Sequence, residues 1–197
     1  EISEVRDRAR ALVKIQDGCD RFCSYCIIPF TRGPVRSRKL ENIKEEVGRI
    51  VKNGYKEVVL TGIHVASYGK DSGDMSLIDV IESIAEIEGL ERIRTSSVEP
   101  LIITEEFVQR LGAVDKFCPH FHLSLQSGSD SVLSRMNRRY TSQEYREAVN
   151  TIRRTFPYAA ITTDVIVGFP EETDQEFEQT YEFLKELKLY ETHIFKY

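Results

Sequence analysis

The chain has 197 residues, of which 41% are hydrophobic and 30% charged, as is typical of a soluble globular protein with one sizeable core. It has no apolar run near the roughly 18 residues that a membrane span needs, and no secretory signal pattern. The formal net charge is −5, whereas a protein that binds nucleic acid over its whole surface is usually basic. We therefore expect any nucleic-acid contact to be local or to lie outside this chain.

Hydrophobic periodicity predicts strands and helices in alternation along the chain. The predicted strands cover residues 12–16, 57–61, 92–96, 121–126, 161–167 and 192–197, and the predicted helices cover residues 42–53, 76–87, 104–111, 142–155 and 173–187. We place Thr104 and Ser142 at helix caps, and Glu171 and Glu172 in a first helical turn. This order predicts a parallel sheet with right-handed crossovers, either doubly wound and open or a partial TIM-like barrel. Both architectures bind ligands at the carboxyl ends of the strands.

Three of the four cysteines lie directly after the first predicted strand. Cys19, Cys23 and Cys26 have the spacing C-x3-C-x2-C, and Cys118 lies far from them and is interpreted as a core thiol. A cluster of four irons normally takes four thiolates, so three would leave one iron open to another ligand. Structural zinc prefers paired C-x2-C sets; no second pair exists here, although His64 could supply a fourth ligand. The spacing favours an iron–sulfur cluster in a reducing, cytosolic setting.

Polar residues and glycines follow the next predicted strands. Gly62, after Thr61, permits close backbone approach to a ligand, but it could equally be a plain turn glycine. Glu99 either binds a polar group at the mouth of the fold or is a solvated loop carboxylate. Ser124 and Gln126 share one face of their strand, where polar side chains are costly unless they are paired or functional. For this pair we favour a functional, inward-facing role.

The fifth predicted strand carries one carboxylate among apolar residues. By strand parity, Asp164 faces the same side as Ile166 and Gly168. Its alternative role is that of a buried structural carboxylate. We interpret the histidines near these strands as satisfied or surface side chains: His120, His122 and His193.

The cysteine motif after the first strand of a β/α fold resembles the signature of the radical S-adenosylmethionine (SAM) enzymes. Further segments extend the resemblance over nearly the whole chain, which is similar to the methylthiotransferase family. These segments are residues 27–38, 60–64, 126–129, 136–141 and 164–172. Residues 63–64 and 97–100 most resemble the tRNA branch that acts on threonylcarbamoyladenosine beside the anticodon. We therefore expect an α/β fold, a parallel (β/α)6 partial TIM-like barrel that is truncated at the sixth strand.

The resemblance implies a transferase whose 4Fe–4S cluster is held by the three cysteines and binds SAM at its free iron. SAM would be cleaved reductively to a 5′-deoxyadenosyl radical, which takes hydrogen from C2 of the modified adenine before methylthiolation. The candidate SAM contacts are Tyr25, Thr61, Gly62, Glu99, Ser124, Gln126, Asp164, Ile166 and Gly168. The alternatives are a radical SAM reaction on another tRNA base or a ribosomal protein, and a non-catalytic metal-binding interaction module.

Two local groups of basic residues offer contacts for anions, with a solvated surface as the alternative. Guanidinium forks suit phosphate and carboxylate groups. The candidate contacts with RNA phosphate or the SAM carboxylate are Arg32, Arg36, Arg38 and Arg138.

The resemblance also implies domains beyond this chain. We expect residues 1–11 to be a linker from a missing N-terminal cluster domain, residues 12–197 to be an incomplete radical SAM core, and a C-terminal RNA-binding domain to be missing. The expected partners are tRNA, through the full-length protein, and an electron donor such as flavodoxin or ferredoxin, with no membrane. The expected location is the cytoplasm, and this fragment alone is expected to lack full activity.

Overall fold

The computed structural model describes residues 9–73 and 75–197, so most of the predicted linker, residues 1–8, lies outside the described residues. The chain divides into two compact units. Among the described residues, the first comprises residues 9–20, 28–73, 75–96 and 109–118, and the second comprises residues 21–27, 97–108 and 119–197. No helix among the described residues combines the length and the apolar character needed to cross a membrane.

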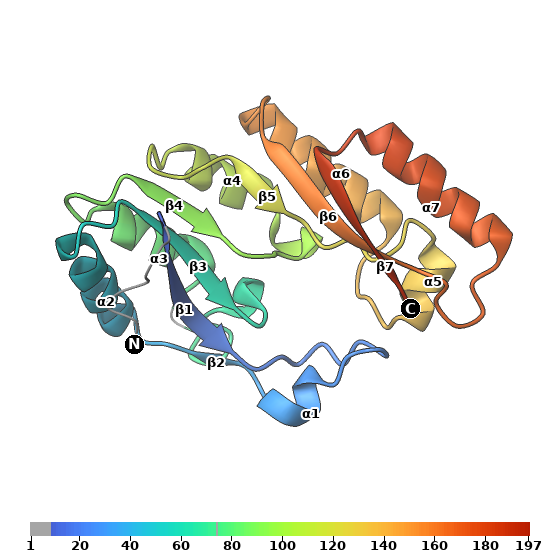
Figure 1. Cartoon of the computed structure of the whole chain (residues 1–197), viewed down its shortest axis with the longest axis horizontal. Helices are drawn as coiled ribbons and strands as arrows, with labels where there is room; N and C mark the ends of the chain where they lie inside the picture. The colour runs from blue at the N-terminus through green and yellow to red at the C-terminus, as the bar shows by residue number, and fades with distance from the viewer. Residues whose placement is uncertain (1–8, 74) are drawn as a thin grey trace. The chain divides into compact units, whose positions relative to one another are not determined.

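The first unit contains a four-stranded sheet in the order β2-β1-β3-β4 (Figure 1). Its strands are β1 (Ala11–Asp17), β2 (Arg36–Ser37), β3 (Glu57–Gly62) and β4 (Arg92–Thr95). β1, β3 and β4 run parallel to one another, and the two-residue β2 pairs antiparallel with β1. The helical elements of this unit are α1 (Ile28–Arg32), α2 (Leu40–Lys52), the 3-10 turn η1 (Val65–Ser67) and α3 (Leu77–Ala85).

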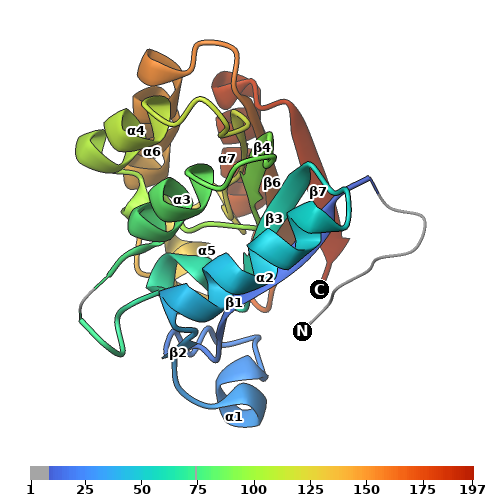
Figure 2. The same ribbon diagram turned by 90° about the vertical axis from the view of Figure 1, so that its left-hand side faces the viewer.

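Burial of apolar side chains holds α2 and α3 to this unit. Figure 2 shows α2 lying along the sheet, where it contacts β1 and α3. Ile43 and Val47 of α2 are fully buried, as are Val13 and Ile15 of β1. Each such side chain contributes on the order of 1.5–3 kcal/mol through removal of apolar surface from water.

The second unit contains a three-stranded parallel sheet in the order β5-β6-β7. Its elements are the 3-10 turn η2 (Pro100–Ile102), β5 (His120–His122), α5 (Asp130–Arg135), α6 (Ser142–Thr155), β6 (Ala160–Val167), α7 (Asp174–Leu187) and β7 (Glu191–Lys196). The helix α4 (Glu105–Gly112) contains residues of both units. The hydroxyls of the buried Tyr145 of α6 and of Thr163 of β6 both donate to Leu123 O, at 2.9 and 2.6 Å, so that face of β6 is covered by helix. Thr162 and Asp164, its neighbours in the strand, point to the other face.

The alternation of strand and helix predicted from the sequence is confirmed, as is the α/β class, but the parallel strands lie in two sheets and the described residues show no closed barrel. The expectation for residues 121–126 was partly wrong. β5 ends at His122, and Gln126 reaches β6 only as an isolated bridge, with a backbone φ of 72°. A left-handed residue does not continue a regular strand.

Two assignments near helix starts were also wrong. Thr141, not Ser142, caps α6, because its hydroxyl accepts a hydrogen bond from Glu144 N while the Glu144 carboxylate accepts one from Thr141 N. Glu171 and Glu172 precede α7, whose first turn carries Asp174 and Glu176 instead. The predicted cap at Thr104 is confirmed, since its Oγ1 accepts from Phe107 N at 3.1 Å.

Gly18, the residue before the first cysteine, occupies a position that other residues cannot fill. Its φ is +74°, and a Cβ atom built on it would lie 1.9 Å from the carbonyl oxygen of Pro34. This close approach lets the next residue, Cys19, donate its N–H to Gly33 O at 3.0 Å. The glycine therefore ties the start of the cysteine motif to the segment that follows α1.

We predict that Gly18→Ala lowers the free energy of unfolding by at least about 2 kcal/mol, because it adds a left-handed strain of about 1–2 kcal/mol to a steric clash. Urea unfolding followed by circular dichroism measures the change. Gly48→Ala is the matched control: it lies inside α2 with no atom within 4 Å of an added Cβ, so we expect it to be neutral or stabilising by up to about 1 kcal/mol. Equal stabilities of the two variants would contradict this account of Gly18.

Candidate functional site

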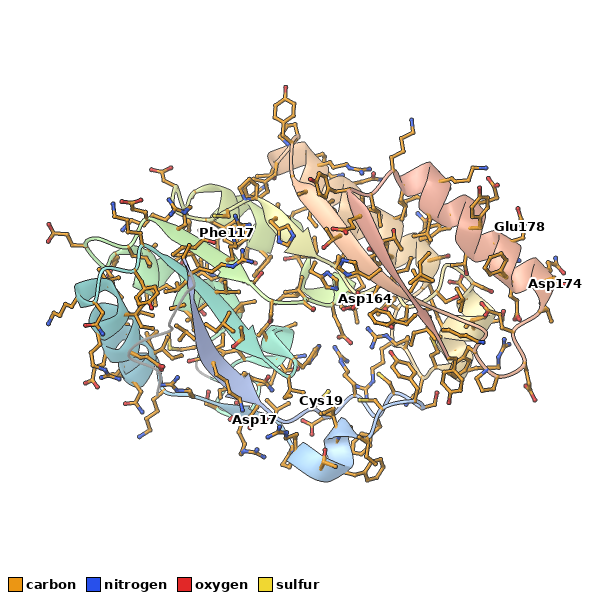
Figure 3. The ribbon with its side chains drawn as sticks, viewed as in Figure 1. Asp17, Cys19, Phe117, Asp164, Asp174 and Glu178 are labelled. Atoms are coloured by element: carbon orange, nitrogen blue, oxygen red, sulfur yellow. The ribbon has the colours of Figure 1, made fainter. Side chains whose placement is uncertain are left out.

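None of the three clustered cysteines forms a disulfide bond, and the chain passes from the first unit to the second between Cys19 and Cys23. Cys19 belongs to the first unit and lies in the loop after β1 (Figure 3). Cys23 and Cys26 belong to the second unit, where a tight turn joins them through a hydrogen bond from Cys26 N to Cys23 O at 2.9 Å. His64, the alternative fourth ligand, is buried in the first unit and contacts the Ser67 hydroxyl through Nδ1.

The segment that follows α5 is shaped by a left-handed residue at the end of the helix. Asn137 has a φ of 56°, and its N–H donates to Ser134 O, while Arg138 N–H donates to Leu133 O. This pair of bonds is a Schellman motif, which satisfies carbonyl groups at the end of a helix and turns the chain away from it. Asn tolerates the left-handed conformation better than most residues.

This turned segment holds the loop that carries Cys23 and Cys26. Ser24 N donates to Met136 O at 3.1 Å, and Ser24 Oγ donates to Arg135 O at 2.8 Å. The Asn137 side-chain amide donates to Phe22 O at 2.8 Å. Three hydrogen bonds between segments more than a hundred residues apart in sequence therefore fix the backbone of the cysteine loop.

Arg138 connects a cysteine to a buried carboxylate. Its Nη1 donates to Cys23 Sγ at 3.2 Å, its Nη2 lies 3.5 Å from Glu99 Oε1, and its Nε donates to Tyr140 Oη at 3.0 Å. The side chains of Arg138 and Glu99 are only 8% and 7% exposed. Glu99 also forms an ion pair with Arg21, at the start of the cysteine loop. The carboxylate thus holds one arginine from the loop and another from the segment after α5.

The environment of Arg138 keeps its guanidinium charged. Burial opposes the charge, but Tyr140, Tyr25, Cys23 and Glu99 outweigh it and raise the pKa of Arg138 above its usual value. The hydrogen bond from Arg138 orients the Cys23 side chain, whose sulfur is an atom that ligates iron and zinc.

Tyr25, between the second and third cysteines, packs into an apolar cluster. Its ring meets the edge of Phe169 with centroids 6.4 Å apart, and Ile166 joins them against Val132 and Met136. Burial raises the pKa of Tyr25 to about 12, so its hydroxyl stays protonated near neutral pH. The structure brings together two candidate SAM contacts, Tyr25 and Ile166, which lie far apart in sequence.

The other candidates of the second unit lie on or beside β6. Ser124 and Gln126 are half-buried and alternate with the buried Leu123 and Leu125, as strand parity predicts. Gly168 directly follows β6 and has a φ of +74°, and its N–H donates to Glu172 Oε2 at 2.5 Å.

Thr61 and Gly62 belong to the first unit and end β3. A Cβ atom on Gly62 would lie 2.8 Å from Gln16 Oε1, the oxygen that accepts a hydrogen bond from His64 N at 2.8 Å. Close packing against Gln16 is therefore one reason for a glycine here, in addition to the two weighed from the sequence.

The candidate arginines differ in how much protein surrounds their charge. Arg38 is paired with the buried Glu46 at 2.5 Å and donates to Lys14 O, so it stabilises the first unit. Arg32 and Arg36 are exposed, although Arg36 Nη1 donates to Arg32 O at 2.8 Å. Arg138 faces Cys23 and Glu99. Arg32 and Arg36 therefore remain the more accessible candidates for an external anion.

Three residues form a group that the sequence interpretation missed. Asp164 Oδ2 lies 3.1 Å from His122 Nε2, and Asp164 Oδ1 lies 3.1 Å from His193 Nδ1. The two histidines are satisfied, as expected, but they share one carboxylate. A signal was present in the sequence, because each of three successive predicted strands carries one histidine or aspartate.

The sequence profile of the Radical SAM superfamily matches residues 13–184, and the chain belongs to this superfamily. Over 198 aligned residues the chain is 44% identical to the threonylcarbamoyladenosine tRNA methylthiotransferase MtaB of Bacillus subtilis, covering 100% of this chain and 44% of that protein. It is 46% identical to MtaB of Aquifex aeolicus, covering 95% and 46%, and 42% identical to tRNA-2-methylthio-N(6)-dimethylallyladenosine synthase of Clostridium tetani, covering 98% and 43%. The chain spans less than half the length of each of these relatives.

Solved structures share the fold at low sequence identity. The radical SAM methyltransferase TsrM of Kitasatospora setae, solved with cobalamin and a [4Fe-4S] cluster, is 17% identical and superposes with a TM-score of 0.78, covering 94% of this chain and 36% of that one. Coproporphyrinogen III oxidase (HemN) of Escherichia coli, a radical SAM enzyme, is 17% identical with a TM-score of 0.63, covering 95% and 44%. Both likenesses support the fold expected from the cysteine motif.

We predict strong energetic coupling between Glu99 and Arg138. In a double-mutant cycle with Glu99→Gln and Arg138→Met, urea unfolding should give a coupling of about 1–3 kcal/mol, because each single variant leaves a buried charge short of a partner. The exposed pair Glu105 and Arg154, of the same unit, is the matched control and should couple by less than about 1 kcal/mol. Additive effects for Glu99 and Arg138 would contradict the role given to this pair.

Proposed function

We propose that this chain is the SAM-cleaving core of a tRNA methylthiotransferase that modifies C2 of threonylcarbamoyladenosine next to the anticodon. The proposal rests above all on the C-x3-C-x2-C motif, whose cysteines form no disulfide, in a chain of the radical SAM superfamily with Arg138 beside Cys23. The names of the relatives support the substrate class.

Cys19, Cys23 and Cys26 would hold a 4Fe–4S cluster. The donors fit, because all three are thiols outside any disulfide and a guanidinium lies 3.2 Å from one of the sulfurs. When bound and reduced, the cluster supplies the electron that cleaves SAM. The protein's part is to fix the cysteine loop through Ser24 and Asn137, and to keep a cation beside the Cys23 sulfur.

We propose that SAM contacts the candidate residues named from the sequence. Tyr25 and Ile166, which pack with Phe169, offer an apolar surface suited to an adenine ring. The remaining proposed SAM contacts are polar side chains or glycines in or near the strands: Thr61, Gly62, Glu99, Ser124, Gln126, Asp164 and Gly168. The exposed Arg32 and Arg36 offer sites for RNA phosphate.

Further domains and partners are proposed for the complete reaction. We propose that an N-terminal domain with a second cluster delivers the sulfur, that a C-terminal domain binds the tRNA, and that flavodoxin or ferredoxin delivers electrons in the cytoplasm. Support comes from the relatives, which are more than twice as long as the aligned region. The four cysteines form no disulfide, which fits a reducing compartment.

We predict that the anaerobically reconstituted, reduced chain shows an EPR signal of a 4Fe–4S cluster that changes on addition of SAM, with formation of 5′-deoxyadenosine. Cys23→Ala should abolish both the SAM-dependent change and the product. The control is Cys118→Ala, which removes a half-buried cysteine of the first unit outside the motif and should retain both. Stoichiometric zinc in place of iron, or equal loss in the two variants, would contradict the proposal and favour a structural metal module.

The choice of tRNA base needs its own comparison, because relatives named for two different modified adenosines have nearly the same identity to this chain. The full-length protein is incubated with tRNA carrying threonylcarbamoyladenosine or dimethylallyladenosine, and the nucleosides are analysed by mass spectrometry. Methylthiolation of the first substrate alone supports the proposal. Methylthiolation of the second alone would redirect it to the other branch.

A further inference from the structure

Three side chains on adjacent parallel strands meet on the face of the second sheet opposite Thr163 and Tyr145. The register pairs His122 with Thr162, and Asp164 with His193. Thr162 and Asp164 share a face of β6 because side chains repeat every two residues along a strand. The register of β5, β6 and β7 therefore brings together the group His122, Asp164 and His193, here called the histidine–aspartate triad; Figure 3 labels Asp164 on β6.

The ligand-type atoms of the triad are close enough to share one ion. One atom from each residue lies within 4.8 Å of the others, and each histidine nitrogen lies 3.1 Å from an Asp164 oxygen. Ligands about 2.0–2.1 Å from a tetrahedral zinc ion are separated by about 3.3 Å. The two imidazole rings stack with centroids 5.7 Å apart and an angle of 21° between their planes.

A neighbouring hydroxyl is placed to set the orientation of one histidine. His122 Nδ1 lies 2.9 Å from Thr162 Oγ1, which leaves Nε2 directed at the aspartate. A threonine hydroxyl can donate or accept, so it satisfies Nδ1 whether Nε2 carries a proton or a metal. Histidine ligands almost always have such a partner on their second nitrogen. His193 Nε2 lies 3.7 Å from Glu191 Oε1.

We propose that the histidine–aspartate triad binds a divalent transition-metal ion, Zn²⁺ or Fe²⁺, at a site separate from the cysteine motif. Two imidazoles and one carboxylate form a ligand set typical of both ions, and they leave coordination positions open for water or an oxygen ligand. Exposure of the side chains rises from 15% for His122 to 29% for Asp164 and 46% for His193. The ion would therefore enter from the side of His193, and its open positions would face solvent.

The test must keep the cysteine thiolates from binding the probe. We use the chain with its 4Fe–4S cluster reconstituted and, in parallel, a chain in which Cys19, Cys23 and Cys26 are replaced by serine, both without SAM because Asp164 is also a proposed SAM contact. Each is titrated with Zn²⁺, and separately with Fe²⁺ under anaerobic conditions, by calorimetry. We expect one ion per chain in either form, with Zn²⁺ bound more tightly than Fe²⁺, as is general for nitrogen and oxygen ligands.

Histidine variants assign the ion to the triad. His122→Gln and His193→Gln should each weaken binding at least tenfold. His120→Gln, which changes a third histidine on the same strand as His122 but outside the triad, should leave binding unchanged. His193 is the most exposed of the three, so its variant remains informative if His122→Gln fails to fold.

Replacing Zn²⁺ with Co²⁺ gives a spectroscopic readout. In the serine-substituted chain, visible d–d bands without thiolate charge-transfer bands are expected for nitrogen and oxygen ligands. The proposal is overturned by absence of saturable binding in the unsubstituted triad, by unchanged binding in His193→Gln, or by equal loss in His120→Gln. These titrations do not measure SAM cleavage, so a negative result leaves the proposed function standing. Conversely, the serine-substituted chain tests the triad even if no cluster forms in the unsubstituted chain.

Discussion

The ion pairs of one buried carboxylate, Glu99, hold the cysteine loop in its place within the second unit. Glu99 binds Arg21 at the start of that loop and Arg138 after α5, and Arg138 in turn donates to the Cys23 sulfur. Taking a carboxylate out of water is costly unless opposite charges and hydrogen bonds compensate it. Two guanidinium groups do so here, and their geometry links the carboxylate to the loop that carries the metal-ligand candidates.

The position of Arg138 depends in turn on how α5 ends. The left-handed Asn137 closes the helix with a Schellman motif and donates its side-chain amide to Phe22 O, so one residue both turns the chain and contacts the loop. The left-handed turn at Asn137 therefore helps to place Arg138 between the buried Glu99 and the Cys23 sulfur. The spacing of the cysteines marks the candidate ligands, but these contacts give the loop its conformation.

The elements that could be predicted from the sequence are those with a long, regular pattern. α2, α6 and α7 have clear amphipathic faces, and their observed bounds lie within about two residues of the predicted ones, which is the usual uncertainty at helix ends. α1 and the two-residue β2 are too short to show a period and were missed. β5 was predicted too long because its apolar alternation continues to Leu125, whereas the ladder ends at His122.

The site could be predicted only in part, for a related reason. Cys19, Cys23 and Cys26 are recognisable because their spacing is local. The partners of Glu99 and the meeting of His122 with Asp164 and His193 depend on tertiary contacts and on strand register, and neither can be read from one sequence without knowledge of which residues lie opposite each other.

The central claim is that three cysteines hold a four-iron cluster with one iron left open. Mössbauer spectroscopy of the chain reconstituted with ⁵⁷Fe, recorded before and after addition of SAM, tests it most directly. The account predicts that one of the four iron sites changes its isomer shift and quadrupole splitting when SAM is added, while the other three keep the values of thiolate-ligated iron. Four iron sites that all stay the same, or a chain that takes up no iron cluster, would contradict it.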